Sequence, residues 1–286
     1  MNVRYEIFES LGFPISVKLV DNSQKDTILL LHGFNDTKES FIFLEEFLNQ
    51  RFNIVSFDYR GHGDSGWKKD GLYHYNENII DLHGVVNVYL PETFFILGHS
   101  LGAALGARYT GIFPEKIEAL ICLEGFSGIK PMNVERENII KWLGRTSSHR
   151  NSKFKTMSSL EEASNVLSMV HPRLNPEKVD KLVRTLVKQV EDGKYIWKSD
   201  PRTKLGFPMP FSPGLSRELW RNILCPVMIC FGEETHLKAA NLQEVLSHFK
   251  NLKYIEIENA GHNIHHDNPE KLIACLDEFL TYNQLV

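Results

Sequence analysis

A five-residue motif could present an exposed serine hydroxyl at the end of a strand. Its residues are Gly98-His99-Ser100-Leu101-Gly102, which follow the apolar run Thr93–Leu97 and precede a stretch of small residues. A Gly-x-Ser-x-Gly sequence between a strand and a helix forms a sharp, strained turn, and its glycines leave room for the serine backbone. The start of the following helix adds positive partial charge for an oxyanion. The pattern therefore predicts Ser100 as a nucleophile; the alternative is a glycine-rich packing turn.

A second turn could contribute to the same chemistry. The apolar run Leu29-Leu30-Leu31 ends in His32-Gly33-Phe34. A backbone N–H from such a turn can point at the oxyanion that forms when a serine attacks a carbonyl. We expect the amides of Phe34 and Leu101 to form this oxyanion hole, and we expect His32 to orient the loop.

A general base for the serine should come from far downstream, after the last strand. His262 ends the sequence Ile257-Glu258-Asn259-Ala260-Gly261-His262 and fits this role. His265 and His266 follow and raise a metal site as an alternative, but no His-Glu-x-x-His or other zinc spacing accompanies them. We therefore predict no metal and no organic cofactor. His99, inside the serine turn, is predicted to be a packing residue.

Short apolar runs alternate with amphipathic stretches along the chain. This alternation is typical of an α/β fold with a mostly parallel sheet and helices on both faces. The expected strands are Tyr5–Glu9 and Ile15–Val20 as an N-terminal hairpin, then Thr27–Leu31, Asn53–Phe57, Thr93–Leu97, Ala119–Leu123, Pro226–Phe231 and Leu252–Ile257. The expected helices between them are Ser40–Asn49, Glu77–Tyr89, Leu101–Phe113, Leu237–Phe249 and Pro269–Leu280.

One long stretch, Gly125–Cys225, lacks a strong strand pattern. Amphipathic helices are predicted there over Val134–Leu143, Leu160–Val170 and Pro176–Val190. Long insertions between sheet strands are usually functional. We therefore expect a core made of residues 1–124 and 226–286 and a helical cap made of residues 125–225; the alternative is a packing subdomain without a gating role.

These motifs together resemble the α/β-hydrolase superfamily over nearly the whole chain. The matching residues are His32-Gly33, Asp58-Tyr59-Arg60-Gly61-His62-Gly63-Asp64-Ser65, Gly98–Gly102, and Gly261-His262 followed by Pro269. The resemblance implies an α/β-hydrolase fold with an eight-stranded sheet, a triad in the order serine, acid, histidine, and a cap after the sixth strand. The segment Tyr195–Pro201 resembles the serine-hydrolase-like branch. A serine at position 100 disfavours the dehalogenase and epoxide-hydrolase branches, which need aspartate there.

The acid of the triad is where the sequence departs from the family pattern. Most relatives carry Asp three residues after the glycine that ends the seventh strand, and here that residue is Thr235. Glu124, at the end of the sixth strand, is the preferred candidate, because some branches carry the acid there and His262 could offset its desolvation. Glu234 is the alternative, with Glu233 beside it. The sequence alone leaves this choice open.

Two other readings of the sequence are disfavoured. Gly61-His62-Gly63-Asp64-Ser65-Gly66 matches a dinucleotide fingerprint, but the required helix does not follow at once. The chain has 32 basic and 36 acidic residues, giving a formal net charge of −4, whereas nucleic-acid binders usually carry a basic excess. We expect neither nucleotide nor nucleic acid as a partner.

The apolar runs are too short to span a bilayer, and Met1–Ser10 lacks an apolar signal core, so no stable membrane insertion is expected. Four scattered cysteines predict buried free thiols and a cytoplasmic location. They are Cys122, Cys225, Cys230 and Cys275.

The sequence thus predicts a serine hydrolase of carboxylesterase or lipase type that cleaves a carboxylic ester through an acyl-enzyme. Some aromatic and Met residues of the cap should roof the site and favour a small or medium acyl group. The candidates are Trp142, Met157, Met169, Tyr195, Trp197, Phe207, Met209, Phe211 and Trp220. The alternatives are a hydrolase of C–C, thioester or lactone bonds, or an inactive ligand-binding homologue. The natural substrate and the oligomeric state are not predicted.

Overall fold

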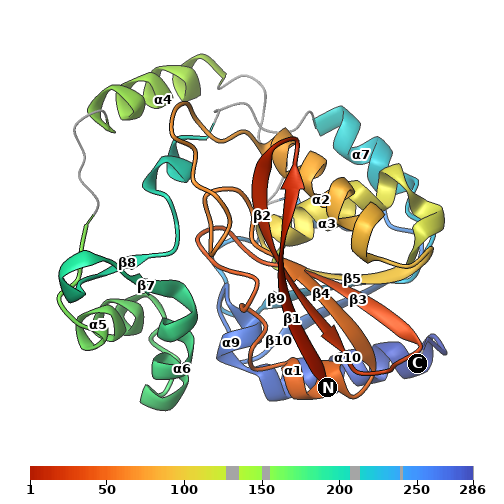
Figure 1. The fold of residues 1–286 in the computed structure, drawn as a ribbon. Helices are drawn as coiled ribbons and strands as arrows, with labels where there is room; N and C mark the ends of the chain where they lie inside the picture. Colours follow the sequence, from red (N-terminus) through yellow and green to blue (C-terminus); the bar gives the residue numbers. More distant parts are fainter. Residues whose placement is uncertain (127–134, 150–154, 207–212, 239–240, 286) are drawn as a thin grey trace.

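A central sheet organises the molecule (Figure 1). The computed structural model describes residues 1–126, 135–149, 155–206, 213–238 and 241–285. The sheet has eight strands in the order β1-β2-β4-β3-β5-β6-β9-β10. Their bounds are β1 Asn2–Ser10, β2 Phe13–Asp21, β3 Asp26–Leu31, β4 Phe52–Phe57, β5 Phe94–His99, β6 Ile117–Leu123, β9 Val227–Gly232 and β10 Leu252–Ile257.

The strand directions confirm the predicted hairpin and the mostly parallel sheet. Strands β1 and β2 pair antiparallel, β2 pairs antiparallel with β4, and every later pair in the sheet is parallel. The hairpin turns at Leu11 and Gly12, whose φ angles of 50° and 77° suit a two-residue turn that matches the strand twist. The central strands are buried on both faces, which explains their continuous apolar runs.

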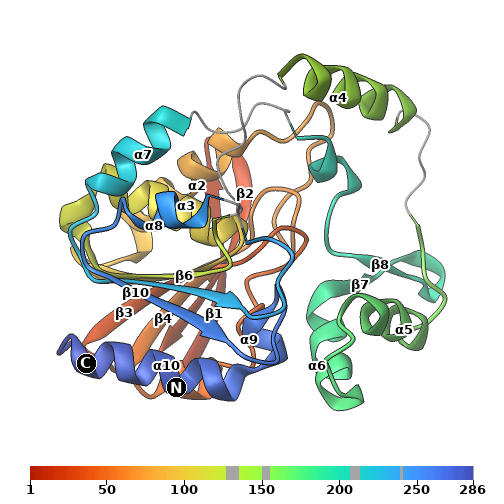
Figure 2. The ribbon, with the colours of Figure 1, turned by 180° about the vertical axis from the view of Figure 1, so that it is seen from behind.

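Helices cover both faces of the sheet (Figure 2). Their bounds in the core are α1 Glu45–Asn49, α2 Tyr75–Tyr89, α3 Leu101–Ile112, α8 Leu242–Leu246, α9 Ile264–Asp267 and α10 Pro269–Tyr282, with a short 3₁₀ helix η1 at Pro114–Lys116. Helices α2, α3 and α8 pack into one apolar core and α1 and α10 into the other. Two predicted helices are shorter than expected, because Ser40–Leu44 forms turns and only Leu242–Leu246 of the stretch Leu237–Phe249 is α-helical among its described residues.

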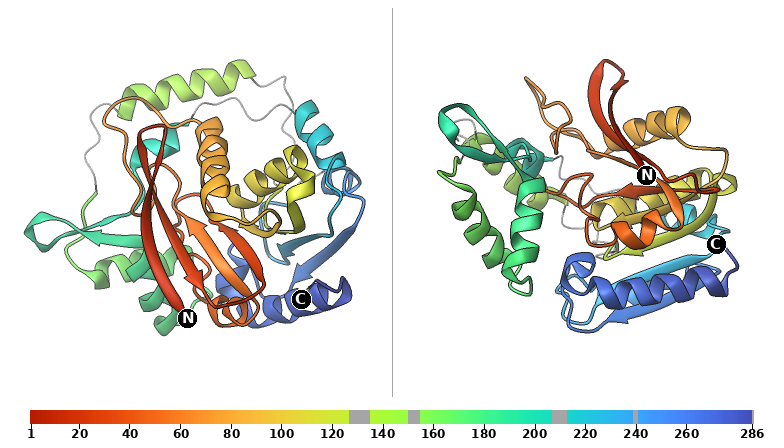
Figure 3. Two further views of the ribbon diagram at one scale, coloured as in Figure 1. Left: turned by 45° about the vertical axis from the view of Figure 1, so that its right-hand side comes forward. Right: turned by 60° about the horizontal axis from the view of Figure 1, so that its bottom comes forward.

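Most of the described chain between β6 and β9 lies beside the sheet, whereas its last helix packs against α3 (Figure 3). This segment contains α4 Glu135–His149, α5 Leu160–Val170, α6 Pro176–Leu186, β7 Val187–Gln189, η3 Glu191–Gly193, β8 Tyr195–Trp197, η4 Pro201–Leu205 and α7 Pro213–Arg221. Helices α5 and α6 pack around an apolar core of their own. The division into core and cap stays a prediction.

The sequence prediction was wrong about two parts of this segment. The helix predicted over Pro176–Val190 ends at Leu186, because Val187–Gln189 pairs antiparallel with Tyr195–Trp197. Cross-strand pairing there overrides the helical periodicity of the sequence. Helix α7 was not predicted. Val134, where the first cap helix was expected to begin, lies outside the described residues.

Two further predictions concern membrane-spanning helices and the state of the cysteines. None of the described helices combines the length and the apolar character that crossing a bilayer requires. The four cysteines are buried and free, as predicted. Burial raises the pKa of the Cys225 thiol to about 12, so this thiol stays protonated and unreactive at neutral pH.

Candidate active site

The turn between β5 and α3 places Ser100 in a strained conformation. Its φ of 51° and ψ of −111° lie outside the usual regions for a residue with a side chain. The turn can be this tight because a Cβ at Gly98 would lie 2.5 Å from the carbonyl of Gly102, and a Cβ at Gly102 would strike the backbone oxygen of Leu31. Gly98 is therefore required by the tight turn from β5 into α3, and Gly102 by the packing of α3 against β3.

His262 approaches Ser100 from the loop between β10 and α9. Its Nε2 lies 3.1 Å from the Ser100 Oγ. The backbone N–H of Ser100 donates to the oxygen of Leu123 at 2.8 Å, which fixes the turn on the end of β6. The sequence places these two side chains 162 residues apart, and the parallel order of the strands brings their loops to one edge of the sheet.

Glu124 completes the chain of contacts from the end of β6. Its Oε2 lies 3.2 Å from His262 Nδ1, and its side chain is fully buried. The backbone N–H of Gly232 donates to Oε1 and the Thr235 hydroxyl donates to Oε2 at 2.7 Å. These donors satisfy a carboxylate that would otherwise be costly to bury. Because a carboxylate only accepts, Nδ1 of His262 carries the proton and Nε2 presents its lone pair to Ser100.

The other acidic candidates lie elsewhere. Glu233 is exposed. The Glu234 side chain is about half exposed and forms an ion pair with Arg173 from the α5–α6 loop. The structure therefore brings Glu124, and not Glu234, to the His262 imidazole. From the sequence, Thr235 marks only the position where the usual aspartate is missing. Its hydrogen bond to Glu124 was not predicted.

The loop after β3 lies against the serine turn. A Cβ at Gly33 would meet His99 Nδ1 at 2.6 Å and the Ser100 Cβ at 3.5 Å, so only glycine allows this close approach. Phe34 follows in the same loop, and Leu101 is the first residue of α3, where an amide has no partner within the helix. Their role as oxyanion donors stays a prediction.

His32 lies where it can orient that loop, as expected. It is buried, its Nδ1 lies 2.7 Å from the oxygen of Gly33, and its Nε2 accepts the backbone N–H of Tyr59 at 3.1 Å. Burial lowers the pKa of His32 well below its ordinary value, so the ring stays neutral. The ring contacts join the ends of β3 and β4.

His99 is a packing residue with one further contact. Its Nε2 lies 2.9 Å from the backbone oxygen of His262. A carbonyl oxygen only accepts, so His99 Nε2 donates and Nδ1 carries a lone pair. This support of the His262 backbone was not predictable from local sequence, because it depends on a loop distant in sequence.

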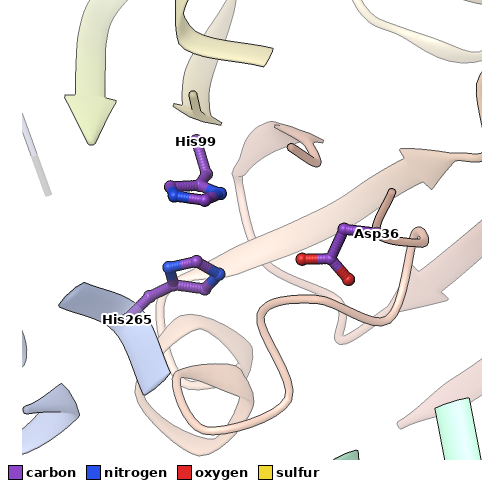
Figure 4. A group of neighbouring side chains, drawn as sticks. All are labelled: Asp36, His99 and His265. Carbon is purple, nitrogen blue, oxygen red and sulfur yellow. The ribbon is translucent and has the colours of Figure 1, made fainter. Parts of the chain in front are cut away.

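Three buried polar side chains, Asp36, His99 and His265, lie close together (Figure 4). Donor atoms of Asp36, His99 and His265 lie within 4.8 Å of one another. Ser40 Oγ donates to Asp36 and lies 2.9 Å from His265 Nε2, and Thr37 N donates to Asp36 at 2.8 Å. Ser40 and Thr37 thus link Asp36 and His265 in a buried hydrogen-bonded group.

The Gly61–Gly66 segment wraps around a buried carboxylate and does not begin a helix. A Cβ at Gly63 would collide with the carboxylate of Asp58, which accepts from Lys38 Nζ at 2.6 Å and from Asp64 N at 2.8 Å. The first helix after it begins at Tyr75. The glycines are therefore explained by the close packing around Asp58, and the contacts do not indicate a nucleotide site.

The segment between β6 and β9 is held to the core on two sides of the site. On one side, buried Asp200 accepts from the Tyr73 hydroxyl at 2.7 Å, and Ser199 Oγ donates to Asn35, which follows Phe34. On the other side, Arg173 pairs with Glu234 and lies 3.8 Å from Asp267. These contacts tie the segment to the loops after β3, β4 and β9 and to α9.

The aromatic and Met residues expected to roof the site lie in several places. Met157 is buried in the apolar core around α5 and α6, with Tyr195 and Trp197 packed against it. Trp220 packs against the core of the sheet, and Met169 is 80% exposed. Trp142 donates to the oxygen of Leu205. Phe207, Met209 and Phe211 lie outside the described residues.

The strand order, the serine turn between β5 and α3, and the histidine after β10 define the α/β-hydrolase class. The model of the alpha/beta hydrolase family matches residues 28–274. The chain therefore belongs to the alpha/beta hydrolase family.

Similar proteins agree with this assignment. A serine hydrolase-like protein of Danio rerio is 24% identical over 266 residues, which cover 88% of this chain and 81% of the relative. The thioesterase domain from the curacin biosynthetic pathway superposes with a TM-score of 0.82 at 20% identity, covering 96% of this chain and 99% of that domain. An M. tuberculosis esterase superposes with a TM-score of 0.79 at 17% identity, covering 98% and 92%. Together with the family match, these similarities support a hydrolase.

Proposed function

We propose that this protein is a serine hydrolase that cleaves a small or medium carboxylic ester through an acyl-enzyme. The observation that carries the proposal is the unbroken contact chain from Ser100 Oγ through the His262 imidazole to the Glu124 carboxylate. Nucleophile, base and orienting acid in this geometry are the arrangement that acyl transfer requires.

In the first half of the reaction, Ser100 Oγ attacks the ester carbonyl carbon while His262 Nε2 takes the hydroxyl proton. The tetrahedral oxyanion accepts hydrogen bonds from the amides of Phe34 and Leu101. Each such donor contributes about 3 kcal/mol to transition-state stabilisation. His262 then gives its proton to the leaving alkoxide oxygen, the carbon–oxygen bond breaks, and an alcohol and an acyl-serine result.

In the second half, water attacks the acyl carbon and His262 again takes a proton. Collapse of the second tetrahedral intermediate returns this proton to Ser100 Oγ and releases the carboxylic acid. Glu124 keeps Nδ1 of His262 protonated and stabilises the imidazolium that forms in each half. The buried position of Glu124 and its Thr235 and Gly232 partners hold this carboxylate in one orientation.

The contacts of the β6–β9 segment support a substrate of limited size. Ser199 reaches Asn35 beside Phe34, and Arg173 reaches the loops of Glu234 and Asp267. These contacts hold the segment close to the loops around the site, which favours a soluble ester over a polymer or a lipid droplet surface. The similar structures include both an esterase and a thioesterase, so the test compares oxygen esters with thioesters.

The test combines covalent labelling with a substrate panel. A fluorophosphonate probe should label the wild-type protein and the Ser247→Ala variant, which removes an exposed hydroxyl, but not Ser100→Ala. Turnover of p-nitrophenyl esters should be highest for short and medium acyl chains and should fall by at least about 10³-fold in Ser100→Ala. Wild-type turnover in Ser100→Ala would overturn the mechanism.

Other outcomes distinguish the alternatives. Labelling at Ser100 with turnover of thioesters or lactones only would keep the nucleophile and replace the substrate class. Absence of labelling together with saturable ligand binding would identify an inactive binding homologue. Faster turnover of long-chain triglyceride emulsions than of soluble short esters would contradict the predicted substrate size.

A further inference from the structure

Among the residues that the structure describes, no strand lies on the outer side of β1 at the edge of the sheet. Strand β1 lies at the end of the strand order and pairs only with β2, over nine residues that contain no proline. Figure 3 shows the β1–β2 hairpin at the periphery of the molecule. An edge strand of this length presents unpaired backbone donors and acceptors, and natural proteins usually protect such an edge.

The outer face of β1 is also apolar. Val3, Tyr5 and Ile7 alternate along the strand and therefore share one face, and they are 37%, 59% and 57% exposed. The intervening residues face the side of α2, where Phe8 packs against Tyr89. Exposed apolar residues gathered on one edge strand mark an interaction site more often than residues scattered over a surface.

The hairpin geometry shows which backbone groups point away from β2. A two-residue turn at Leu11 and Gly12 places Ser10 and Phe13 in the hydrogen-bonded pair that closes the hairpin. Hydrogen-bonded and non-hydrogen-bonded pairs then alternate along an antiparallel ladder. The N–H and C=O groups of Val3, Tyr5 and Ile7 therefore point outward, where a further strand would pair.

The charges on β1 select one partner and one register. A second copy of β1 could add antiparallel with its two-fold axis on Arg4, Tyr5 or Glu6. An axis on Arg4 would place two Arg4 side chains opposite each other, and an axis on Glu6 would do the same with two glutamates, which is unfavourable. An axis on Tyr5 places Arg4 opposite Glu6 twice and Val3 opposite Ile7 twice.

We propose that two copies of this chain associate through β1, antiparallel and with Tyr5 on the two-fold axis, so that the two sheets become continuous. The outward groups of Val3, Tyr5 and Ile7 bond to those of the other copy, and their side chains form one apolar stripe. An interface made by one strand pair lies near the lower end of specific interfaces, about 1,200 Å² in total. The dimer is therefore expected to dissociate on dilution.

Charge exchange between two variants tests the register. Wild type should sediment as a concentration-dependent dimer in analytical ultracentrifugation. Arg4→Glu alone and Glu6→Arg alone should be monomeric at the concentrations where wild type is dimeric, because each places like charges opposite each other. An equimolar mixture of the two variants should recover the dimer. The Arg4 and Glu6 side chains are 59% and 40% exposed, and circular dichroism checks that each variant folds.

Cysteine cross-linking tests the axis independently. Tyr5→Cys should form an intermolecular disulfide on mild oxidation, because a hydrogen-bonded pair places its Cα atoms about 5.5 Å apart. Val3→Cys is the matched control and should not cross-link to itself, because it faces Ile7. A monomeric wild type, or single charge variants that dimerise as wild type does, would overturn the proposal. Cross-linking of Val3→Cys without cross-linking of Tyr5→Cys would overturn the register.

Discussion

Thr235 and His262 contact the same carboxylate oxygen of Glu124, at 2.7 Å and 3.2 Å. The family pattern places an aspartate at the position that Thr235 occupies. Here the carboxylate comes from the neighbouring strand end, and the residue at the usual acid position donates a hydrogen bond to it. This arrangement allows an acid on either strand because the ends of β6 and β9 are adjacent in the sheet.

The first prediction concerns the choice of acid. Glu124→Gln keeps the size of the side chain but removes the charge that stabilises the His262 imidazolium, so kcat should fall by about 10³–10⁴-fold. Glu234→Gln is the matched control and should leave kcat within about twofold, because its exposed ion pair with Arg173 contributes little. Steady-state kinetics on a p-nitrophenyl ester measures both. A larger loss in Glu234→Gln than in Glu124→Gln would reject Glu124 as the acid.

The second prediction concerns Thr235 as a positioning residue. Thr235→Val removes one hydrogen bond from a buried carboxylate and should lower kcat by about tenfold, which corresponds to about 1–2 kcal/mol. Thr235→Ser retains the hydroxyl and should restore most of the rate. KM should change little in both variants. If Thr235→Val and Thr235→Ser had the same kcat, the hydroxyl would have no part in orienting Glu124.

Adding the aspartate of the family pattern extends this test. Thr235→Asp in the Glu124→Gln background supplies a carboxylate from β9 in place of the one from β6. Because the Thr235 hydroxyl already contacts Glu124 beside His262, we expect at least a tenfold recovery of kcat over Glu124→Gln alone. A double variant no faster than Glu124→Gln would show that the two strand ends are not equivalent positions for the acid.

The third prediction concerns the glycine at the start of α3. A Cβ at Gly102 would strike the backbone oxygens of Leu31 and His32, which cannot move without displacing β3. Gly102→Ala should therefore lower the free energy of unfolding by several kcal/mol, about 3 or more. Gly144→Ala is the control, since α4 leaves open space around it, and it should be neutral or stabilising by up to about 1 kcal/mol. Urea denaturation compares the two; equal effects would contradict the packing argument.

The fourth prediction concerns stability at acidic pH. Burial lowers the pKa of His62 to about 4 and that of His266 to about 3, whereas the unfolded chain protonates near 6.5. Below pH 6.5 the unfolded state therefore binds more protons than the folded state, and the free energy of unfolding falls as the pH decreases. The loss of stability caused by His62 begins as the pH falls below 6.5 and is complete below about pH 4. In total it amounts to about 3 kcal/mol.

Asp36 opposes this trend. Burial raises its pKa to about 6 from an ordinary value of 3.8, so between these values the folded state takes up the proton that the unfolded state lacks. Asp36→Asn should therefore make the loss of stability on acidification steeper, and His62→Gln should make it shallower. Urea denaturation at several pH values between 7 and 5 measures these slopes. A wild-type stability that increased on acidification would contradict the prediction.

Several features followed from local sequence alone. The glycines around Ser100 predicted a sharp turn because few other residues fit between β5 and α3, and the alternation of apolar runs predicted the parallel sheet. The sequence also predicted the hairpin and helix α5, whose bounds match the prediction. Both depend on turn residues and helix caps, which act over a few positions. Helix α6 was predicted too long, since Val187–Gln189 pairs with a strand that local periodicity does not reveal.

The identity of the groups around His262 was decided only by the tertiary structure. Glu124, Glu233 and Glu234 all follow strand ends, so the sequence favoured Glu124 as the acid but kept Glu234 as an alternative. Strand order and the strained backbone at Glu124, with φ of 57°, turn one carboxylate inward, while Arg173 holds Glu234 at the surface. The sequence determined which chemical groups were present, and long-range packing determined which of them meet, because side-chain distances depend on contacts between segments far apart in the chain.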